Sequence, residues 1–431
     1  MAVRVDDLRC AACGGCVGLC PSDALTLDEM HLRVAADACT ECGLCVAACP
    51  MGALSLTSTP AISQRPLRAQ YDVIVVGAGP AGSQAAEAAA SAGASVLLLE
   101  KRQEIGSPVR CAEGVAREAL EALVPLEMRW TAAVVERAEV TVETAGGLLR
   151  LEAGGGKGYI LERRLFDAYL AERAVAAGAD VRVKTAVIGL LWDGSRVAGV
   201  RVRMDGQERE IAASVVIGAD GVESWVGRWA GLSGGLPAQD HMTCAQYLLA
   251  GIDTDARTIQ YFISDRLAPG GYVWIFPKGE RRANVGLGVQ ADLAVEPPLT
   301  LLNRFVESRP ALAKGSPVTL ISGAVPVASQ PARLVSDGVM LVGDAARQVD
   351  PLTGGGIIMA MRAGRLAGRV AAEAARAGAP DRRRLSAYET EWQAGYGRML
   401  ARNYRLRQRF PPHQRANEDF LRLFAIAAAG A

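Results

Sequence analysis

The sequence predicts an α/β protein in which a parallel sheet binds a dinucleotide and a small cysteine-rich domain precedes that sheet. An apolar run at 73–76 leads into the glycine pattern G-x-G-x-x-G at 77–82, an alanine-rich helix to about residue 92, and a second apolar run at 95–99 that ends in Glu100. This order of strand, glycine turn, helix and strand is typical of a dinucleotide-binding unit. Eight of the ten cysteines lie in the first fifty residues, in two equal sets. The 431 residues suffice for two or three domains.

The glycines of this Rossmann-type unit have separate tasks. Gly77 allows the tight turn after the strand, Gly79 lets a pyrophosphate approach the backbone, and Gly82 lets the helix pack closely on the strand. The amino end of the helix offers free N–H groups to the phosphates. Glu100 stands where an acid accepts ribose hydroxyls. The residues assigned to this part of the site are Gly77, Gly79, Pro80, Ala81, Gly82, Glu100 and Lys101.

Composition excludes several classes of protein. A net charge of +1 does not create the positive field of a nucleic-acid-binding protein. The start of the chain lacks the apolar segment of a secretory signal, and no run reaches the roughly eighteen apolar residues of a membrane-spanning helix. Grouped cysteines favour metal binding in a reducing compartment over disulfides. We therefore expect a cytoplasmic protein, with peripheral contact at the inner membrane face as an open alternative.

The N-terminal cysteines form two copies of C-x2-C-x2-C-x3-C-P at an offset of 29 residues. The repeat continues in the residues that follow, PSDALTL at 21–27 and PMGALSL at 50–56. The segment resembles bacterial-type ferredoxins with two 4Fe–4S clusters, in which the fourth cysteine of each run binds the other cluster. Zinc is the alternative, but zinc sites use wider pairs of ligands. The resemblance implies one cluster on Cys10, Cys13, Cys16 and Cys49, and a second on Cys20, Cys39, Cys42 and Cys45.

Later segments favour FAD as the dinucleotide. A helix is expected at 166–177, strands at 181–184, 215–218 and 339–342, and a hairpin that turns at Asp193-Gly194. In this order the segments resemble the glutathione-reductase-like FAD-binding fold, in its p-hydroxybenzoate-hydroxylase-like branch. The resemblance implies that an aspartate holds the ribityl chain and that a glycine-led helix points N–H groups at the flavin ring. The residues assigned in this way are Asp220, Gly221, Gly343, Asp344, Pro351, Gly354, Gly355, Gly356 and Ile357.

Two further segments narrow the family. They are GSPVRCAEG at 106–114 and PGGYVWIFP at 269–277. Both are similar to the geranylgeranyl reductase family, digeranylgeranylglycerophospholipid reductase-like flavoenzymes that saturate isoprenoid C=C bonds. The resemblance runs from about Tyr71 to the C-terminus. It departs from the family at Ala112, where many relatives have glycine, and in the fused ferredoxin segment.

The candidate catalytic residues lie in these two segments. Tyr272 and Trp274 alternate with apolar residues and predict a strand with one aromatic face, which is either ordinary sheet core or, by the resemblance, the wall of a prenyl tunnel beside the flavin. Cys111 and Glu113 are alternative proton donors in a loop expected near the flavin. Cys111 instead shapes the pocket in a second interpretation, and Cys244 is interpreted as a small buried residue. Arg110, Arg117 and Arg164 are candidates for phosphate or flavin contacts, with solvated charges as the alternative.

The expected domains follow from these segments. The C-terminal helix expected at 385–410 carries interleaved arginines and aromatics, which suit either an anionic membrane surface or a helix that caps the domain. The apolar residues 421–431 are too few to span a membrane. The boundaries are 1–58 for the ferredoxin domain, 59–70 for a linker, 71–235 with 325–380 for FAD binding (part of the substrate domain being inserted around 109–160), 236–324 for the substrate-binding sheet, and 381–431 for the C-terminal helices.

The sequence thus predicts an FAD-dependent reductase of geranylgeranyl or polyprenyl C=C bonds. A low-potential donor protein is expected to reduce the clusters, which pass electrons singly to FAD. An isoprenoid lipid or a polyprenyl quinone is the expected substrate. The main alternative is an iron–sulfur flavoprotein that passes electrons to a quinone head group, as electron-transfer-flavoprotein:quinone oxidoreductases do. A flavin monooxygenase or halogenase is a third interpretation, which fused oxygen-sensitive clusters disfavour.

Overall fold

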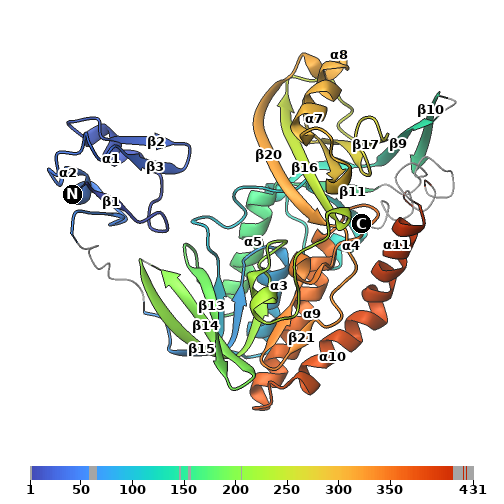
Figure 1. Cartoon of the computed structure of the whole chain (residues 1–431). Coiled ribbons are helices and arrows are strands. Elements are labelled where there is room, and N and C mark those ends of the chain that lie inside the picture. The colour runs from blue at the N-terminus through green and yellow to red at the C-terminus, as the bar shows by residue number, and fades with distance from the viewer. Residues whose placement is uncertain are drawn as a thin grey trace.

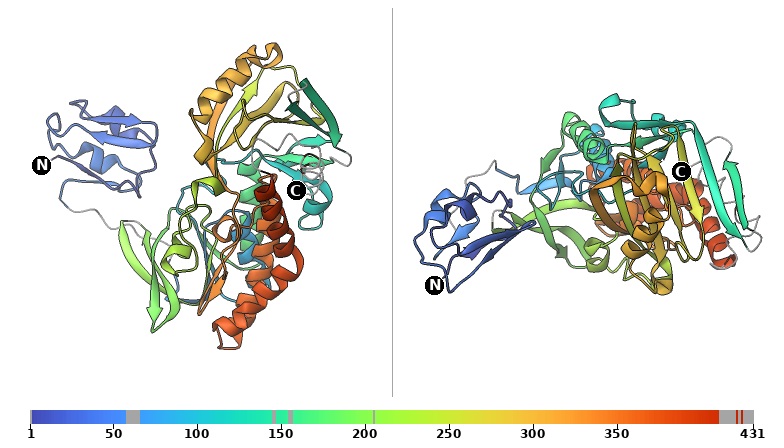
Figure 2. Two further views of the ribbon diagram at one scale, coloured as in Figure 1. Left: turned by 45° about the vertical axis from the view of Figure 1, so that its right-hand side comes forward. Right: turned by 90° about the horizontal axis from the view of Figure 1, so that it is seen from above.

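The structure, a computed structural model of the chain, describes residues 2–57, 66–144, 147–153, 157–204 and 206–410, together with Leu421 and Phe424. Figure 1 shows a small N-terminal domain in blue at the left, beside a larger body made of a lower and an upper sheet region. The lower region holds an eight-stranded sheet with a parallel centre, and the upper region holds a seven-stranded, mostly antiparallel sheet. The C-terminal helices run along the outside of this body (Figure 2).

The N-terminal domain consists of two copies of one unit, as the cysteine repeat predicts. Helices α1 (Gly15–Leu19) and α2 (Leu44–Ala48) each follow a glycine in the left-handed region, with φ of 73° at Gly14 and 74° at Gly43. Other side chains are strained in this region, which explains the glycine in both cysteine runs. The strands are β1 (Arg4–Val5), β2 (Leu25–Asp28), β3 (His31–Val34) and β4 (Leu54–Ser55), with β1 paired to β4 and β2 to β3.

The core of this domain is small. Its apolar cluster consists of Val3, Leu25, Leu32, Cys45 and Leu54, surrounded by partly buried cysteines. A domain of this size needs more than apolar packing for its stability. It contacts the larger body where the Lys184 ammonium donates a hydrogen bond to the Cys10 carbonyl.

The dinucleotide-binding unit predicted around the glycine motif is present at the centre of the lower sheet. Four consecutive apolar residues of β6 are fully buried, which is typical of a parallel strand covered on both faces. The sheet runs in the order β12 (Asp180–Arg182), β6 (Val96–Leu99), β5 (Gln70–Val76), β15 (Gln207–Gly218), β14 (Arg196–Met204) and β13 (Ala186–Asp193), with β22 (Val339–Leu341) paired to β15 and β21 (Val335–Ser336) paired to β22.

Two helices of this region lie together and start at the same end. Helix α3 (Pro80–Ser91) packs on α9 (Ile357–Arg376), because α9 presents glycines to it. A Cβ at Gly364 would lie 2.0 Å from the Ala81 carbonyl oxygen, and one at Gly368 would lie 2.1 Å from that of Ala85. The two helices therefore run parallel, and α9 extends about two turns beyond the amino end of α3.

Helix α5 (Arg163–Ala176) also packs on α3 and begins three residues earlier than expected. The short helix α6 (Trp225–Trp229) follows β15.

The upper sheet separates two kinds of side chain along one strand. In β18 (Tyr272–Pro277), Val273 and Ile275 pack in the core beneath α7 (Pro298–Glu307), with Leu302 and Phe305. Tyr272, Trp274 and Phe276 lie on the other face, as the alternation predicts. The sheet order is β10 (Gly147–Ala153), β9 (Arg137–Thr144), β17 (Thr258–Ile263), β18, β19 (Arg282–Gln290), β16 (His241–Ala250) and β20 (Ser316–Pro326), and α8 (Pro310–Ala313) follows α7.

A three-stranded sheet and the C-terminal helices complete the body. The small sheet comprises β7 (Gly114–Ala116), β11 (Gly158–Leu161) and β8 (Thr131–Val135), with α4 (Arg117–Glu121) after β7. Helix α10 (Arg382–Trp392) continues through a π-helical turn at 393–397 into α11 (Arg398–Arg409). Among the described residues, no helix is both long and apolar enough to cross a membrane. Most of the predicted linker, the break at Pro411-Pro412 and most of the apolar tail lie outside the described residues.

Candidate active site

A cavity of about 340 Å³ lies between the two sheet regions. Backbone of the glycine motif forms part of its wall at Gly79, and the loop before α9 forms another part at Gly355. Cys111 and the aromatic face of β18 line the opposite side. A pocket bounded by the carboxyl edge of a parallel sheet is where α/β proteins commonly bind their ligands.

The glycine motif has the shape that a dinucleotide needs. A Cβ at Gly77 would lie 2.4 Å from the Ala219 carbonyl oxygen, and one at Gly82 would lie 1.8 Å from the Gly77 carbonyl oxygen, so both positions require glycine for packing. A Cβ at Gly79 meets nothing within 4 Å among the described atoms. Open space therefore faces the amino end of α3, where a pyrophosphate is favoured. This arrangement fits FAD.

The carboxylate of Glu100 braces the same turn. It accepts hydrogen bonds from the backbone N–H groups of Ala78 at 3.1 Å and of Arg102 at 3.0 Å. Its side chain is buried and lies behind the wall of the cavity. The position suits the ribose contact that the sequence predicts, and it shows that Glu100 also holds the loop itself.

Asp344 lies in the cavity near the amino end of α9. Burial raises its pKa to about 6, and the Arg163 guanidinium opposes part of this rise. A carboxyl oxygen that faces the cavity can accept a hydrogen bond from a hydroxyl group of a ligand. The ribityl chain of FAD supplies such hydroxyls.

The structure brings most of the predicted cofactor residues to the cavity. Gly79, Pro80, Ala81, Arg110, Gly221, Gly343, Asp344, Pro351, Gly354, Gly355, Gly356 and Ile357 line it, whereas Gly77, Gly82, Glu100, Lys101, Arg117 and Asp220 do not. One oxygen of Asp220 accepts the N–H of Val226 at 2.9 Å, and its Oδ1 is buried with no hydrogen-bond partner among the described residues. Asp220 therefore accepts a hydrogen bond from the first turn of α6, and its role in FAD binding stays a prediction.

The basic residues proposed from the sequence for phosphate or flavin contacts mostly pair with neighbouring side chains. Lys101 pairs with Glu223 at 2.6 Å, and Arg110 pairs with the same carboxylate at 3.4 Å. Arg117 lies over the Tyr159 ring, with 5.3 Å from its Cζ to the ring centroid. Arg164 is exposed and pairs with Glu104, whereas its neighbour Arg163 lines the cavity. Of the three arginine candidates, Arg110 therefore lines the cavity, whereas Arg164 lies one residue from an arginine that does.

The aromatic face of β18 forms an apolar wall with two polar anchors. The Tyr272 hydroxyl donates a hydrogen bond to the Thr353 carbonyl, which ties the upper sheet to the loop before α9. Trp274 Nε1 donates to Gln246 Oε1 at 2.7 Å. Because both anchors fix ring orientation, the wall is rigid as well as dry.

Cys111 faces this wall from the opposite loop. Its carbonyl accepts a hydrogen bond from Gln246 Nε2 at 3.1 Å, and its Sγ accepts one from the Glu113 backbone N–H at 3.2 Å. Burial raises the pKa of the Cys111 thiol, while Arg163, which contacts the thiol, lowers it. The other cavity cysteine, Cys244, has its pKa raised by burial to about 12.

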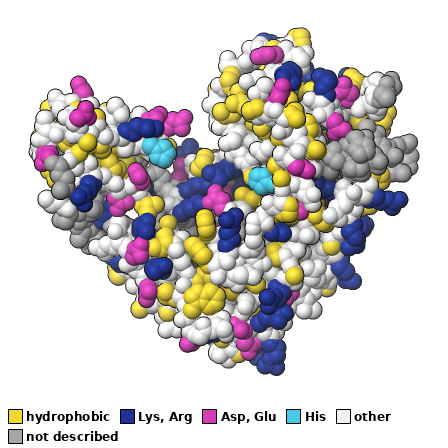
Figure 3. All heavy atoms as spheres, viewed as in Figure 1, with side chains coloured by type: hydrophobic (Ala, Val, Ile, Leu, Met, Phe, Trp, Pro, Cys, Tyr) yellow, Lys and Arg dark blue, Asp and Glu magenta, His cyan; other side chains and the backbone are white. Residues whose placement is uncertain are grey.

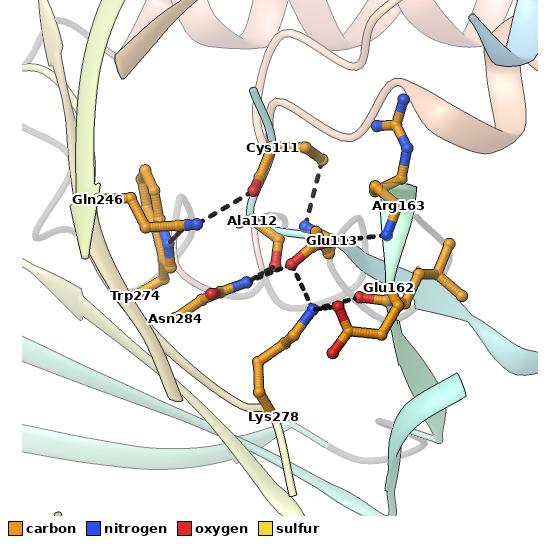
Figure 4. Close-up of polar contacts among 10 residues, drawn as sticks. Cys111, Ala112, Glu113, Glu162, Arg163, Gln246, Trp274, Lys278 and Asn284 are labelled. Atoms are coloured by element: carbon orange, nitrogen blue, oxygen red, sulfur yellow. Dashed lines mark hydrogen bonds and ion pairs between the residues drawn. The ribbon is translucent and has the colours of Figure 1, made fainter. Parts of the chain in front are cut away.

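The Glu113 carboxylate is enclosed by donors from three other segments (Figure 4). Lys278 and Asn284, which hold it, are absent from the candidates that the sequence offered. So are Arg163 and Gln246. One local signal exists for Arg163, since Asp167 follows it by one helical turn and pairs with it at 2.7 Å. For the others, nothing in the sequence distinguishes them from ordinary polar residues of a strand or turn.

Family comparison decides the class of protein. Residues 240–325 match the model of the geranylgeranyl reductase catalytic domain. The digeranylgeranylglycerophospholipid reductase of Methanothrix thermoacetophila is 48% identical over 343 residues, which cover 79% of this chain and 87% of that protein. This chain belongs to the geranylgeranyl reductase family.

Other members and solved structures agree with this placement in the geranylgeranyl reductase family. The corresponding protein of Methanosarcina acetivorans is 49% identical over 76% of this chain and 81% of its own length. A geranylgeranyl bacteriochlorophyll reductase-like protein from Thermoplasma acidophilum has a TM-score of 0.77 at 37% identity, covering 83% of this chain and 91% of that one. A flavin-dependent brominase at 19% identity, with a TM-score of 0.66, shares the fold alone.

The remaining matches identify the cofactors of this geranylgeranyl reductase family member. Residues 72–261 match the FAD-dependent oxidoreductase model, and residues 2–50 match the 4Fe–4S dicluster model. The enzyme is therefore an FAD-dependent oxidoreductase with a fused iron–sulfur domain. The predicted fold class is confirmed in both parts.

The thiols of the N-terminal domain lie in two groups that fit the predicted ligand exchange. Cys16 interacts electrostatically with Cys10, Cys13 and Cys49, and Cys45 does so with Cys42 and Cys20. No three potential ligands among the described residues converge on a single metal ion, and a four-iron cluster takes its thiolates at separate irons. The Sγ atoms of Cys20 and Cys49, at equivalent positions of the repeat, accept backbone N–H groups from Ala24 at 3.3 Å and Ala53 at 3.2 Å. Such N–H···S bonds tune cluster potentials.

Proposed function

We propose that this enzyme saturates isoprenoid C=C bonds of a lipid, with electrons reaching FAD through its two 4Fe–4S clusters. One observation carries the proposal: a single cavity combines the dinucleotide loops, an aromatic wall and the Cys111 thiol. The printed names of the relatives describe reductases of digeranylgeranylglycerophospholipids, which suits a substrate of this class. An external low-potential donor is the source of the electrons.

Saturation of an alkene requires a hydride on one carbon and a proton on the other. Reduced FAD supplies the hydride when it is bound. The chain must supply the proton, exclude water and hold the alkene between the two sources. Tyr272, Trp274 and Phe276 provide the dry wall that holds a prenyl chain.

Cys111 is the proton source that the geometry favours over Glu113. Its raised pKa keeps the thiol protonated at neutral pH, so a proton is available. Arg163, in contact with the thiol, stabilises the thiolate that remains after transfer. The Glu113 carboxylate, in contrast, accepts hydrogen bonds on both of its oxygens from Arg163, Lys278 and Asn284, so its polar contacts are with the protein. Solvent restores the thiol proton before the next turnover.

The proposal extends to contact with a membrane surface through α11. Its exposed arginines follow one face at helical spacing and make no ion pair with a carboxylate in the described part of the chain; they are Arg398, Arg402, Arg405 and Arg409. Lys and Arg side chains gather along the lower right edge in Figure 3, where α10 and α11 lie. The opposite face of α11 carries Arg407, which lines the cavity and donates to Gln290 Oε1 at 2.7 Å. One helix thus connects an anion-binding surface to the site where a membrane lipid reacts.

An anaerobic experiment tests the central proposal. The purified protein is reduced with dithionite, freed of excess reductant, and mixed with a geranylgeranyl lipid or a polyprenyl quinone. Flavin reoxidation, with product masses raised by about two units per saturated bond, is the expected result. Reoxidation by the quinone with the unsaturation of its chain intact would contradict the proposal and favour electron transfer to a head group.

Membrane contact has its own test. Replacing the four exposed arginines of α11 by glutamine should reduce sedimentation with vesicles that contain anionic phospholipid, and should leave turnover of a detergent-dispersed lipid unchanged. Equal sedimentation of the variant and the parent enzyme would rule out this surface.

A further inference from the structure

We propose that Lys278 is a positioning residue that holds the Cys111 thiol in place through Glu113. The proposal rests on the proposed function, since the position of the thiol matters only if Cys111 delivers the proton. Lys278 lies just after the aromatic strand β18 and does not line the cavity. It therefore acts through its neighbours and not on substrate.

Glu113 is held on both of its carboxylate oxygens (Figure 4). Oε1 accepts the backbone N–H of Arg163 at 2.8 Å. Oε2 accepts both Lys278 Nζ and Asn284 Nδ2 at 2.7 Å. The side chains of Lys278 and Glu113 are 3% and 4% exposed, so this ion pair is shielded from water and strengthened by low polarity.

Lys278 has no spare donor. An ammonium has three N–H groups, and those of Lys278 go to Glu113, to the Leu161 carbonyl at 2.7 Å and to Glu162 at 2.9 Å. The Leu161 backbone N–H in turn donates a hydrogen bond to the Glu113 carbonyl oxygen at 2.9 Å. Lys278 thereby joins the end of β18, the end of β11 and the Cys111 loop at one point.

The backbone explains why the loop needs this support. Glu113 has φ of +76°, a left-handed conformation that side chains other than glycine adopt at a cost. Its N–H is the group that donates to the Cys111 thiol. Asn284 holds the intervening residue as well, because its Nδ2 also lies 3.1 Å from the Ala112 carbonyl oxygen. If the buried contacts are lost, the strained residue relaxes and the peptide beneath the thiol turns with it.

Charge links Lys278 to the same thiol. Arg163 and Glu113 act electrostatically on Cys111, and Cys111 in turn acts on Cys244 and Tyr272. Glu113 raises the pKa of the thiol, and Lys278 offsets that carboxylate. Without the ammonium, the uncompensated charge of Glu113 makes the thiol harder to deprotonate.

The test uses Lys278→Met, Lys278→Arg and, as a matched control, Glu162→Gln. Glu162 is the exposed partner of Lys278, with 38% of its side chain accessible, and it makes no contact with Cys111. Each holoenzyme is assayed for lipid reduction and for its FAD content. Cys111 alkylation by iodoacetamide is followed from pH 7 to 10 on the tryptic peptide 111–117, which contains no other cysteine.

Lys278→Met is expected to lower kcat at least tenfold with KM and FAD content within about twofold, and to move the midpoint of alkylation upward by about one pH unit. Lys278→Arg should restore most of the parent kcat and most of the parent alkylation midpoint. Glu162→Gln should behave as the parent enzyme in both measurements. Parent kcat and an unmoved alkylation midpoint in Lys278→Met would overturn the proposal.

If Lys278→Met fails to retain FAD, Asn284→Ser takes its place. This variant removes the other donor to Glu113 Oε2 and should lower kcat about threefold or more; parent behaviour in it would equally overturn the proposal. A parent enzyme that reduces no lipid would refute the proposed function instead, while the alkylation profiles would still report whether Lys278 controls the thiol.

Discussion

The expected cluster ligands all come from the 40 residues between Cys10 and Cys49, whereas the residues around the Cys111 thiol come from several separate stretches between 111 and 284. In the first region, ligand spacing alone defines the site, because metal binding supplies much of the folding free energy of so small a domain. In the second, Lys278, Asn284 and Arg163 reach Glu113 only after two sheets and a helix have packed. A repeat of cysteines is therefore visible in the sequence, and a buried polar network is not.

Removal of one cluster ligand should have the largest effect, because the fold of the N-terminal domain depends on its metal. Cys45→Ser, at the buried thiol of the second group, should abolish that cluster and unfold the N-terminal domain, since its core is small. FAD should remain bound, and turnover supported by a protein donor should fall by more than a hundredfold. Iron content and limited proteolysis of residues 1–57 check this outcome. Cys244→Ser is the control, and a full complement of iron in Cys45→Ser would contradict the ligand assignment.

Two glycines of one motif should behave differently in the flavin region. Gly82→Ala places a Cβ 1.8 Å from a backbone oxygen, and should destabilise the apoprotein by more than about 4 kcal/mol or prevent folding. Gly79→Ala meets open space, and should leave the stability of the apoprotein within about 0.5 kcal/mol of the parent while lowering FAD content. Thermal unfolding and flavin absorbance separate the two effects. Equal destabilisation by both changes would disprove the assignment of Gly79 to ligand contact.

Asp344→Asn tests whether a cofactor contact is kept at the expense of stability. The folded carboxyl has its pKa raised from 3.8 to about 6, so its ionisation destabilises the folded parent apoprotein progressively as the pH rises from about 4 to about 6. The variant should be more stable than the parent by about 3 kcal/mol at pH 7.5, with weaker FAD binding. Urea unfolding of the apoprotein across this range checks the sign. A stability difference that does not shrink below pH 6 would contradict it.

Trp274→Phe should have the smallest effect. The ring face is kept, but the 2.7 Å hydrogen bond to Gln246 is lost, which leaves a buried acceptor unpaired at a cost of about 1–3 kcal/mol. Since Gln246 also holds the Cys111 carbonyl, turnover should fall a few-fold. Phe276→Leu, on the same face of the strand, has no such link and serves as the control. Identical losses in the two variants would show that only the apolar wall matters.

Local pattern sufficed wherever a feature depends on neighbouring residues. The strand at 73–76, the glycine turn, the helix to about 92 and the aromatic face of 272–276 all appear in the structure near their expected bounds. Each of these follows from burial periodicity or from the conformational freedom of glycine. Arg110 was named from the sequence and lines the cavity, but Arg164 was named in place of Arg163, because these two neighbours are alike in sequence and differ only in the direction that α5 gives them.

The sequence by itself determined the class of this protein: two cluster-binding repeats, one dinucleotide unit, and the segments that place the chain in the geranylgeranyl reductase family. It also determined which face of β18 is aromatic, since the alternation of side chains is a local property of a strand. Only the tertiary structure decided what Glu113 does. Its carboxylate meets Lys278 and Asn284 across 165 and 171 residues, and contacts of that range depend on how whole elements pack and not on any spacing along the chain.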